Sequence, residues 1–292
     1  MDNTIKNMIL SPLNLLYRFS PELTLKILFF AKMKQRLDLK NPTTYNEKIQ
    51  WIKLYDRHKL MPKCADKYTV REYVKSCGCE EILNDLIWDG FDPEDIPFET
   101  LPEQFVIKVT HGSTFNIICK DKESLNINKT KLQLKKWLKT DFLPCYGEWF
   151  YGVERPRIII EKYLEDRVGA PLFDYKVFCF HGEPKLVYVD TWKGNQHTIN
   201  AYDIDFNLLP EVKLGYDNDL ETQVEKPESF DQMLDYSRRL SKPFRHVRVD
   251  FYNVKGKVVF GELTFTKSAG FGKITPYSFD VEMGDLIRLP SK

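Results

Sequence analysis

The sequence lacks an excess of charge of either sign, and it lacks paired cysteines. Among its 292 residues, 43 Lys and Arg balance 42 Asp and Glu, whereas an obligate nucleic-acid-binding protein normally carries a basic excess or stripe. Its six cysteines are scattered without a CxxC pair, which predicts free thiols rather than a disulfide framework. We therefore expect a cytoplasmic protein with no nucleic-acid partner, built as one large or two modest domains.

A long uncharged apolar run is also missing. Residues 8–39 are rich in Leu, Ile and Phe, but Arg18, Glu22 and Lys26 interrupt them. The longest uncharged stretch falls short of the roughly 18 apolar residues that a membrane span needs. We expect no transmembrane segment.

The segment 20–40 predicts a basic amphipathic helix instead. Ser20 is a suitable N-cap residue and Pro21 suits the first helical position. Apolar residues lie near one side of this helix and basic residues elsewhere: Leu23, Ile27, Phe30 and Leu37 against Lys26, Lys32, Lys34 and Arg36. Such a helix more often packs on its own domain, but it also suits an anionic membrane surface. Peripheral contact of residues 20–40 with the inner face of the membrane therefore stays open.

The common glycine-rich nucleotide motifs are absent as well. Neither GxGxxG nor GxxxxGK[ST] occurs, so neither a Rossmann site nor a P-loop is supported. Residues 105–119 predict a strand, a small polar loop and a second strand. Lys108 interrupts the first strand, and the loop 111–116 offers backbone N–H groups and hydroxyls to a phosphate. Ordinary hairpins have similar loops, so this segment by itself is weak evidence.

The most informative stretch is 246–265, which predicts a β-hairpin around a three-residue loop at 254–256. In that register Arg248 faces Glu262, Asp250 faces Phe260, and His246 faces Thr264. Because side chains alternate along a strand, one face carries His246, Arg248, Asp250, Glu262 and Thr264. The other face carries Val247, Val249, Phe251, Val259, Leu263 and Phe265 and predicts a core.

Two interpretations of the polar face stay open on this pattern. It is either a solvated surface with an Arg–Glu cross-strand pair, which contributes little, or a site for a divalent metal and a phosphate. In the second case Asp250 and Glu262 supply the hard oxygen ligands that Mg²⁺ prefers, and Arg248 supplies a planar donor for an anion.

Further elements follow from local patterns. The Thr44-Tyr-Asn-Glu47 capping box opens a helix to about residue 57, and further helices are expected over 66–75, 129–140 and 230–240. Strands are expected at 158–164, 174–180 and 185–190, with a turn at 181–182. We expect irregular structure over 191–228, and a flexible run over 267–272 followed by a short tail.

Six stretches occur in a characteristic order: 45–55, 65–68, 108–113, 160–164, 175–182 and 248–252 with 260–265. Together they resemble the ATP-grasp superfamily and, more narrowly, its TupA-like branch, which is found with bacterial surface-polysaccharide pathways. The resemblance implies an α+β ATP-grasp fold, in which two α+β lobes clamp ATP behind an N-terminal helical segment. The expected boundaries are 1–60 for that segment, 61–156 for the first lobe and 157–292 for the second.

The resemblance also implies roles for the polar residues. Arg248 and Lys176 would act on the transferred phosphoryl group. Asp250, Glu262 and Thr264 would hold Mg²⁺, with Thr264 where many ATP-grasp enzymes have Asn, which leaves the number of metals open. The expected nucleotide contacts are Lys67, Lys108, His111, Gly112, Ser113, Thr114, Glu161, Lys162, Tyr163, Leu164 and again Lys176. Either Glu161 or the backbone beside it would read the exocyclic amine of adenine.

The implied activity is that of an ATP- and Mg²⁺-dependent carboxylate–amine ligase that forms an amide through an acyl phosphate. By the same resemblance the carboxylate belongs to a uronic acid of a capsule or other surface glycan, and the amine to an amino acid or a related compound. A sugar phosphotransferase using the same cleft, and a non-catalytic nucleotide-binding scaffold of glycan assembly, remain alternatives. Phosphoryl transfer needs positioning and charge rather than a covalent nucleophile, and the sequence has no Ser–His–Asp or Cys–His signature.

Overall fold

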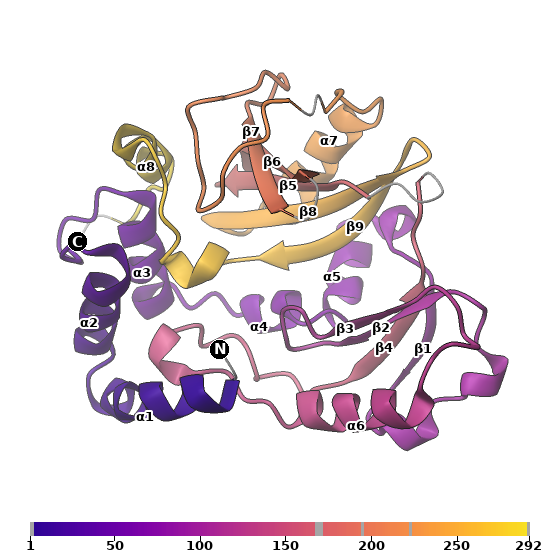
Figure 1. Ribbon diagram of the computed structural model, residues 1–292. Coiled ribbons are helices and arrows are strands. Elements are labelled where there is room, and N and C mark those ends of the chain that lie inside the picture. Colours follow the sequence, from indigo (N-terminus) through magenta and orange to yellow (C-terminus); the bar gives the residue numbers. More distant parts are fainter. Residues whose placement is uncertain (1–2, 167–171, 194–195, 222–223, 291–292) are drawn as a thin grey trace.

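The chain begins with a helical segment at the periphery of the molecule. The computed structural model describes residues 3–166, 172–193, 196–221 and 224–290, and in it α1 (Asn3–Phe19), α2 (Pro21–Met33) and α3 (Tyr45–Tyr55) precede the first sheet (Figure 1). The capping box is confirmed, since the Thr44 side chain accepts from the amide of Glu47 and the Glu47 side chain accepts from that of Thr44. No helix within the described ranges is long and apolar enough to cross a membrane.

Helix α2 packs through a different side from the one the sequence suggests. Its buried residues are Thr24, Leu25, Leu28 and Phe29, whereas Leu23, Ile27 and Phe30 are exposed by 47%, 41% and 58%. The helix does pack on its own domain, but through Leu25, Leu28 and Phe29 rather than through this apolar side. The helix is apolar on both sides, and periodicity alone does not say which side the protein covers.

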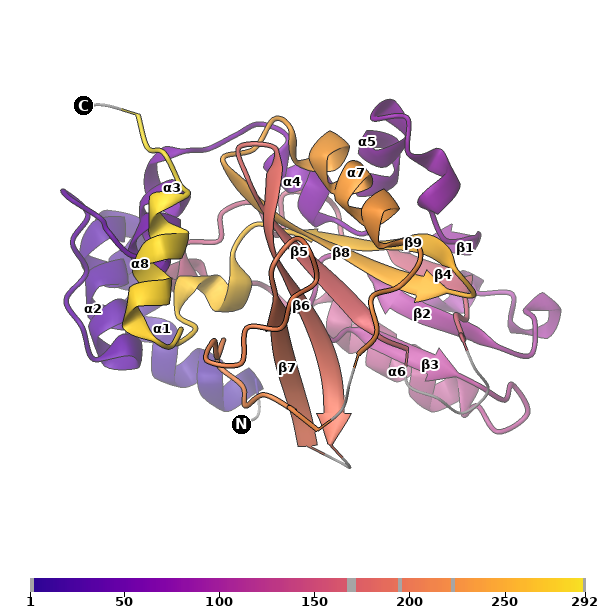
Figure 2. The same cartoon turned by 90° about the horizontal axis from the view of Figure 1, so that it is seen from above.

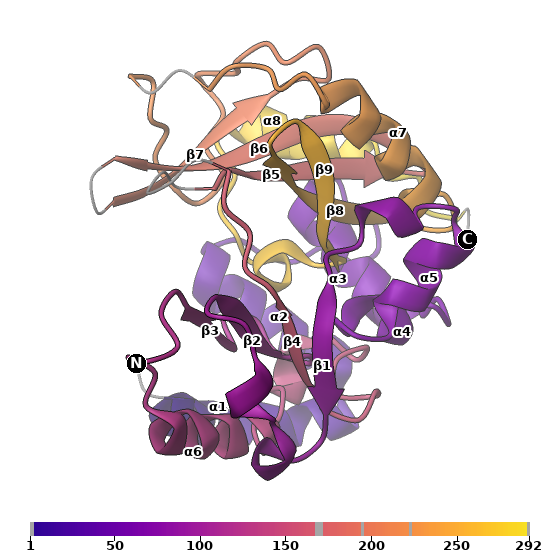
Figure 3. The same cartoon turned by 90° about the vertical axis from the view of Figure 1, so that its right-hand side faces the viewer.

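The first sheet has four antiparallel strands in the order β1 (Leu86–Gly90), β4 (Ile158–Lys162), β2 (Phe105–Val109) and β3 (Asn116–Cys119). Helix α6 (Ile127–Leu138) covers one face, and its Leu134 lies in the core with Phe105, Ile107 and Ile160. The opposite face, which carries Lys108 and Glu161, looks toward the second sheet (Figures 1 and 3). Because β4 pairs within this sheet, we move the boundary between the lobes from residue 157 to the end of that strand.

The second sheet has five antiparallel strands in the order β7-β6-β5-β8-β9. They are β5 (Asp174–Phe180), β6 (Glu183–Lys193), β7 (Gln196–Tyr202), β8 (His246–Val254) and β9 (Lys257–Thr264). The expectation of irregular structure over 191–228 is wrong for the end of β6 and for β7; residues 194–195 and 222–223 lie outside the described residues.

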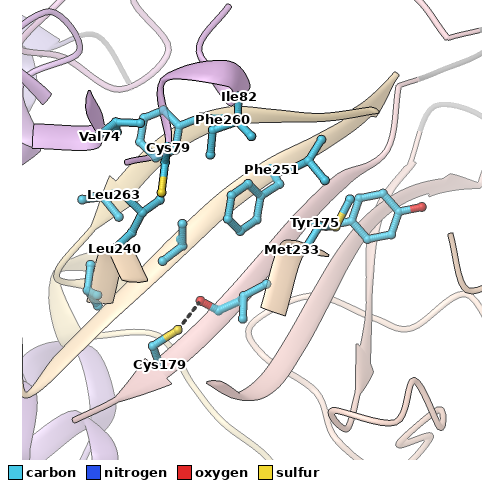
Figure 4. Packing of buried hydrophobic residues seen from close by; sticks show 14 of the residues in the cluster. Val74, Cys79, Ile82, Tyr175, Cys179, Met233, Leu240, Phe251, Phe260 and Leu263 are labelled. Atoms are coloured by element: carbon cyan, nitrogen blue, oxygen red, sulfur yellow. Dashed lines mark hydrogen bonds between the residues drawn. The ribbon is translucent and has the colours of Figure 1, made fainter. Parts of the chain in front are cut away.

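One face of the second sheet carries the largest core of the described residues. Helices α4 (Met61–Ala65), α5 (Val70–Ser76) and α7 (Phe230–Ser241) cover it, and Figure 4 shows residues of α5 and α7 packed against the strands, with Val74, Met233, Leu240, Phe251 and Leu263 among them. The helix expected over 66–75 begins only at Val70, because the Asp66 side chain accepts from the amides of Tyr68 and Thr69 and forms a turn between α4 and α5.

The opposite face of this sheet is covered over only part of its area by α3 and α8 (Tyr277–Asp285), which lie side by side (Figure 2). Tyr45, Ile49 and Met283 pack there on Phe178 and Tyr188. Farther along the same strands this face carries polar residues and borders the space between the sheets.

Helix α8 corrects the expectation of a short tail. Short 3₁₀ turns occupy Glu80–Ile82, Pro93–Asp95, Phe98–Thr100, Pro144–Tyr146 and Lys267–Gly270.

The β8–β9 hairpin has a different register from the expected one. Its turn has two residues, Lys255 and Gly256, both with positive φ of 52° and 79°, as a type I′ turn requires. A bulge at Gly261 then aligns Asp250 with Glu262 and Arg248 with Thr264. A Cβ at Gly261 would lie 3.0 Å from the carbonyl oxygen of Asp250, so glycine permits the close approach.

The register change keeps the polar face but alters the core face. His246, Arg248, Asp250, Glu262 and Thr264 do share one face, as predicted. On the other face the bulge turns Val258 and Phe260 into the core, rather than Val259.

His246 lies at the end of the polar face that is covered by α3. Its Nδ1 lies 3.0 Å from the carbonyl oxygen of Cys179 and its Nε2 lies 2.9 Å from the hydroxyl of Tyr45. Because a carbonyl only accepts, Nδ1 carries the proton and Nε2 accepts from Tyr45. Burial lowers the pKa of His246 to about 3.

We expect His246 to make folding sensitive to acid. Its pKa is lower in the folded chain than the ordinary value near 6.5 of an unfolded one, so its contribution is present above that value and is lost as the pH falls toward 3. Between about pH 7 and about pH 5 the loss is about 2 kcal/mol. Urea unfolding of the wild type and of His246→Gln at both pH values measures it; equal losses in the two proteins would contradict the assignment.

Candidate active site

The predicted site residues converge between the two sheets. Strands β2 and β4 supply Lys108 and Glu161 from one side, and β5, β8 and β9 supply the polar face from the other. Lys67 lies between α4 and α5, beside both sheets. A cavity of about 550 Å³ opens at the centre and is lined by Gly112, Ser113, Thr114, Arg248, Glu262 and Thr264, together with residues of 140–151 and 266–269.

The hairpin residues form one bonded cluster. Arg248 donates from Nε and Nη2 to the two carboxylate oxygens of Asp250, at 2.6 and 2.5 Å. Its Nη2 also lies 3.0 Å from Thr264 Oγ1 and 3.4 Å from Glu262 Oε1, and the Thr264 hydroxyl donates to Glu262 at 3.0 Å. Burial opposes ionisation of Arg248, but Asp250 outweighs it and holds the pKa of the guanidinium above its usual value.

This cluster offers the oxygen donors that Mg²⁺ requires, although not equally. Both oxygens of Asp250 already accept from Arg248, whereas the Glu262 side chain is 43% exposed and borders the cavity. Burial alone would raise the pKa of Glu262, but Lys67 and Arg248 hold it below its usual value, so the carboxylate is ionised. Within the described residues no three acidic, His or Cys side chains form a cage; Mg²⁺ commonly takes one or two carboxylates and completes its shell with phosphates and water. The residues fit that ion, for which Glu262 would be the most accessible carboxylate.

Lys67 joins the glycine loop to this cluster. Its Nζ donates to the carbonyl oxygen of Gly112 at 2.7 Å and lies 3.9 Å from Glu262 Oε2. A Cβ at Gly112 would overlap the ring of Phe115, only 2.0 Å away, so this loop conformation needs glycine. Ser113 and Thr114 line the cavity. The loop is thus held at the side of the cavity opposite the hairpin.

The His111 side chain points into the protein, which leaves its backbone for the expected phosphate contact. The ring is only 4% exposed, its Nε2 lies 2.9 Å from the carbonyl oxygen of Thr140, and it packs against Phe115 and Phe142. His111 therefore anchors the base of the glycine loop to the segment around residue 140.

The Glu161 carboxylate also has partners that the sequence did not predict. Its two oxygens pair with Lys108 Nζ at 2.7 Å and with Arg71 Nη1 at 3.3 Å. With both oxygens engaged in a buried position, the carboxylate positions Lys108 rather than reading the adenine amine. Arg71 has no signal in the sequence, because its partner lies 90 positions away.

The residues at the end of β4 also differ in whether their side chains face the cavity. The Lys162 side chain is 64% exposed and pairs with Asp85, and its carbonyl oxygen accepts from Asn84. Its side chain thus turns away from the cavity, and the nucleotide contact expected of Lys162 would have to come from its backbone. Tyr163 and Leu164 follow as half-buried residues at the end of the strand.

Lys176 lies in the cleft with two carboxylates that the sequence did not single out. It pairs with Asp174 two positions before it, and with Asp190 on β6 at 2.6 Å. Burial would lower its pKa, but Asp174, Asp250 and Asp190 raise it above the usual value. Strand alternation places Asp174 on the face of Lys176 and was a usable signal, whereas Asp190 required the register of β5 and β6.

Lys267 is a further buried cation in the cavity wall. Its Nζ donates to the carbonyl oxygen of Leu214 and lies 5.7 Å from the centre of the Tyr188 ring, and burial lowers its pKa to about 8. The run 267–272 was expected to be flexible. Buried Lys53 instead fixes its beginning by donating to Ala269 O and Tyr146 O, both at 2.7 Å.

Comparison with known proteins agrees with this arrangement. The model of one family, TupA-like ATPgrasp, matches residues 47–288. No curated protein sequence matches the chain.

Several solved structures are similar to the chain at low identity. D-Alanine–D-alanine ligase from Bacillus anthracis in complex with ATP has 15% identity and a TM-score of 0.45, over 82% of this chain and 66% of that one. The enzyme of the same name from Helicobacter pylori has 12% identity and a TM-score of 0.44, over 84% and 69%. The ATP-grasp ligase PsnB with its minimal precursor has 11% identity and a TM-score of 0.42, over 73% and 55%. The chain thus spans just under two thirds of the first ligase and about half of PsnB.

Proposed function

Because the chain belongs to the TupA-like ATP-grasp family, we propose that it is an ATP- and Mg²⁺-dependent carboxylate–amine ligase. The observation that carries the proposal is the convergence of Arg248, Asp250, Glu262 and Thr264 on one side of a cavity with Lys67 and the glycine loop on the other. Cations and hard oxygen ligands at one point are what a polyphosphate and its metal require.

In the proposed reaction a substrate carboxylate oxygen attacks the γ-phosphorus of ATP, and ADP leaves. An amine nitrogen then attacks the acyl carbon of the resulting acyl phosphate, inorganic phosphate leaves, and the amine gives up a proton. Mg²⁺, when bound, would neutralise charge on the phosphate oxygens, and Glu262, Asp250 and Thr264 would hold it.

The protein's own residues would share the remaining work. Lys108, held by Glu161, and Lys176, held by Asp174 and Asp190, would bind phosphate oxygens with ammonium groups already oriented. Arg248 would stabilise the charge that develops on the transferred group. Gly112, Ser113 and Thr114 would cover the phosphates and exclude water, which otherwise hydrolyses an acyl phosphate. Tyr163 and Leu164 would contact the adenine ring.

We propose a uronic-acid carboxylate of a surface glycan and an amino acid or related amine as substrates, on the cytoplasmic side of the membrane. These substrates rest on the family resemblance rather than on geometry. A sugar phosphotransferase would use the same phosphate site, and it would release ADP with a sugar hydroxyl and no amine. A non-catalytic scaffold has no use for the paired carboxylates.

The test of the nucleotide site is a thermal unfolding scan with Mg²⁺ and a non-hydrolysable ATP analogue. At ~100 times the dissociation constant, the ligand adds about 2.7 kcal/mol of stability and raises the unfolding temperature by a few degrees. ADP release is then measured with uronic acids in the presence and absence of amines. Release that needs both substrates supports the ligase, whereas the absence of any shift at saturating nucleotide would overturn the nucleotide site.

Lys108→Ala is expected to weaken binding of the ATP analogue roughly tenfold to a hundredfold, because a hydrogen bond to a charged phosphate contributes about 1.5–3 kcal/mol. Titration calorimetry measures the change. Lys129→Ala, an exposed lysine on the outer helix α6, is the matched control. Unchanged affinity in Lys108→Ala would remove this lysine from the nucleotide site.

A further inference from the structure

The first two helices present an apolar surface that nothing in the described chain covers. Six large apolar side chains are exposed there: Ile9 by 60%, Leu15 by 58%, Phe19 by 81%, Leu23 by 47%, Ile27 by 41% and Phe30 by 58%. We call this set the α1–α2 face. Both helices lie at the periphery of the molecule (Figures 1 and 2). Within α2, Leu23, Ile27 and Phe30 are spaced by four and three residues, which places them on one side of that helix, and Phe19 ends α1 directly before it.

Helix α2 is apolar on two sides. Leu25 and Phe29 are at most 1% exposed and lie in a core cluster with Leu37 and Leu39, while Leu23, Ile27 and Phe30 point outward. A helix that is apolar all round normally has apolar cover on every side. Here the protein supplies that cover on one side, and an exposed apolar patch of this kind marks an interaction site.

The surroundings of the α1–α2 face are strongly basic. Residues 1–40 contain seven Lys and Arg against three Asp and Glu, although the whole chain has a net charge of only +1. Among the described side chains the exposed cations of this segment are Arg18, Lys26, Lys34, Arg36 and Lys40, apart from Lys32, which lies over the rings of Tyr146 and Phe271 and lines the central cavity. The one acidic side chain within α2, Glu22, already interacts with Lys26 and Tyr55. The partner of this face is therefore expected to be apolar and anionic.

We propose that the α1–α2 face docks the protein on the surface of an anionic lipid bilayer. Phe and Leu side chains enter the boundary between headgroups and acyl chains, and the surrounding Lys and Arg meet the anionic headgroups. Because the inner side of α2 stays packed on the protein, the helix lies in the plane of the surface.

The charges favour a bilayer over a second copy of the chain. In a symmetric dimer the same patch meets itself, so two basic rims would face each other and repel. An anionic membrane neutralises the same rim. The inference does not depend on the proposed ligase activity.

Co-sedimentation of the full chain with vesicles tests the proposal. We expect binding to vesicles of phosphatidylcholine with phosphatidylglycerol, at least tenfold weaker binding to phosphatidylcholine alone, and weakening by salt, which screens the headgroup attraction. Phe19→Asp/Phe30→Asp should lower binding to the anionic vesicles by at least tenfold. The control Leu132→Asp/Leu220→Asp introduces the same charges at side chains that are 69% and 57% exposed elsewhere, and should bind as the wild type does.

Three results would overturn the proposal. The first is the absence of wild-type binding to anionic vesicles, and the second is equal loss of binding in both double variants. The third is a lipid-free dimer, detected by analytical ultracentrifugation, that Phe19→Asp/Phe30→Asp dissociates, which would assign the face to a second copy. Cooperative thermal unfolding without ligand reports whether each variant is folded.

Discussion

Glu262→Gln is expected to lower turnover about a thousandfold and to leave the folded state nearly as stable as the wild type. The carboxylate is the most accessible oxygen donor of the cluster, with a side chain 43% exposed toward the cavity, and loss of a metal ligand removes several kcal/mol of transition-state stabilisation. Its contacts to Lys67 and Arg248 are long, at 3.9 and 3.4 Å, so they contribute little to folding.

ADP release measures the effect on turnover, and thermal unfolding without ligand measures the effect on stability. Glu123→Gln, an exposed glutamate beyond the first sheet, is the matched control and should keep full activity. Normal turnover in Glu262→Gln would contradict its role as a metal ligand. A Mg²⁺-dependent thermal shift that survives in this variant would contradict it as well.

Asp250→Asn is expected to destabilise the fold, unlike Glu262→Gln. Asp250 is 3% exposed and both of its oxygens accept from Arg248 at 2.5–2.6 Å. Removing one partner of a buried ion pair costs about 3–5 kcal/mol, and here Arg248 would lose its two short bonds and keep only the longer contact to Glu262. For a chain of this size the unfolding temperature should fall by roughly 6 °C or more.

A charge-free double variant separates this loss of stability from the loss of catalysis. Arg248→Met/Asp250→Leu removes both charges, and should recover part of the stability lost in Asp250→Asn while remaining inactive. Unfolding in urea gives the three free energies. Equal stability of the wild type and Asp250→Asn would show that the Arg248–Asp250 pair does not hold the hairpin.

Several features of this protein follow from its sequence because they depend on short-range chemistry. The polar face of 246–265 follows from the two-residue alternation of a strand, and the start of α3 follows from a capping box that spans three residues. Lys108 was recognised because a charge inside an apolar strand is conspicuous. The family assignment depended on the order of such segments, and it survived errors in the turn and register of the hairpin.

The pairing of the site residues was decided only by the tertiary structure. Glu161 bonds to Lys108 across 53 positions and to Arg71 across 90, and Lys176 pairs with Asp190 only because β5 and β6 align Asp174 with Asp190. His111 is turned inward by Thr140, Phe115 and Phe142. Which partner an ionic group finds depends on how distant strands pack, and local sequence carries no record of it.

The α1–α2 face illustrates the same division. The sequence alone predicted a helix rich in both apolar and basic residues within 20–40, and α2 occupies residues 21–33 of that segment. Only the tertiary structure decided that Leu25 and Phe29 face the protein while Leu23, Ile27 and Phe30 face outward. The physical reason is that a helix with two apolar sides buries whichever side fits the surface offered to it, and here that surface is formed partly by Leu37 and Leu39 of the next segment.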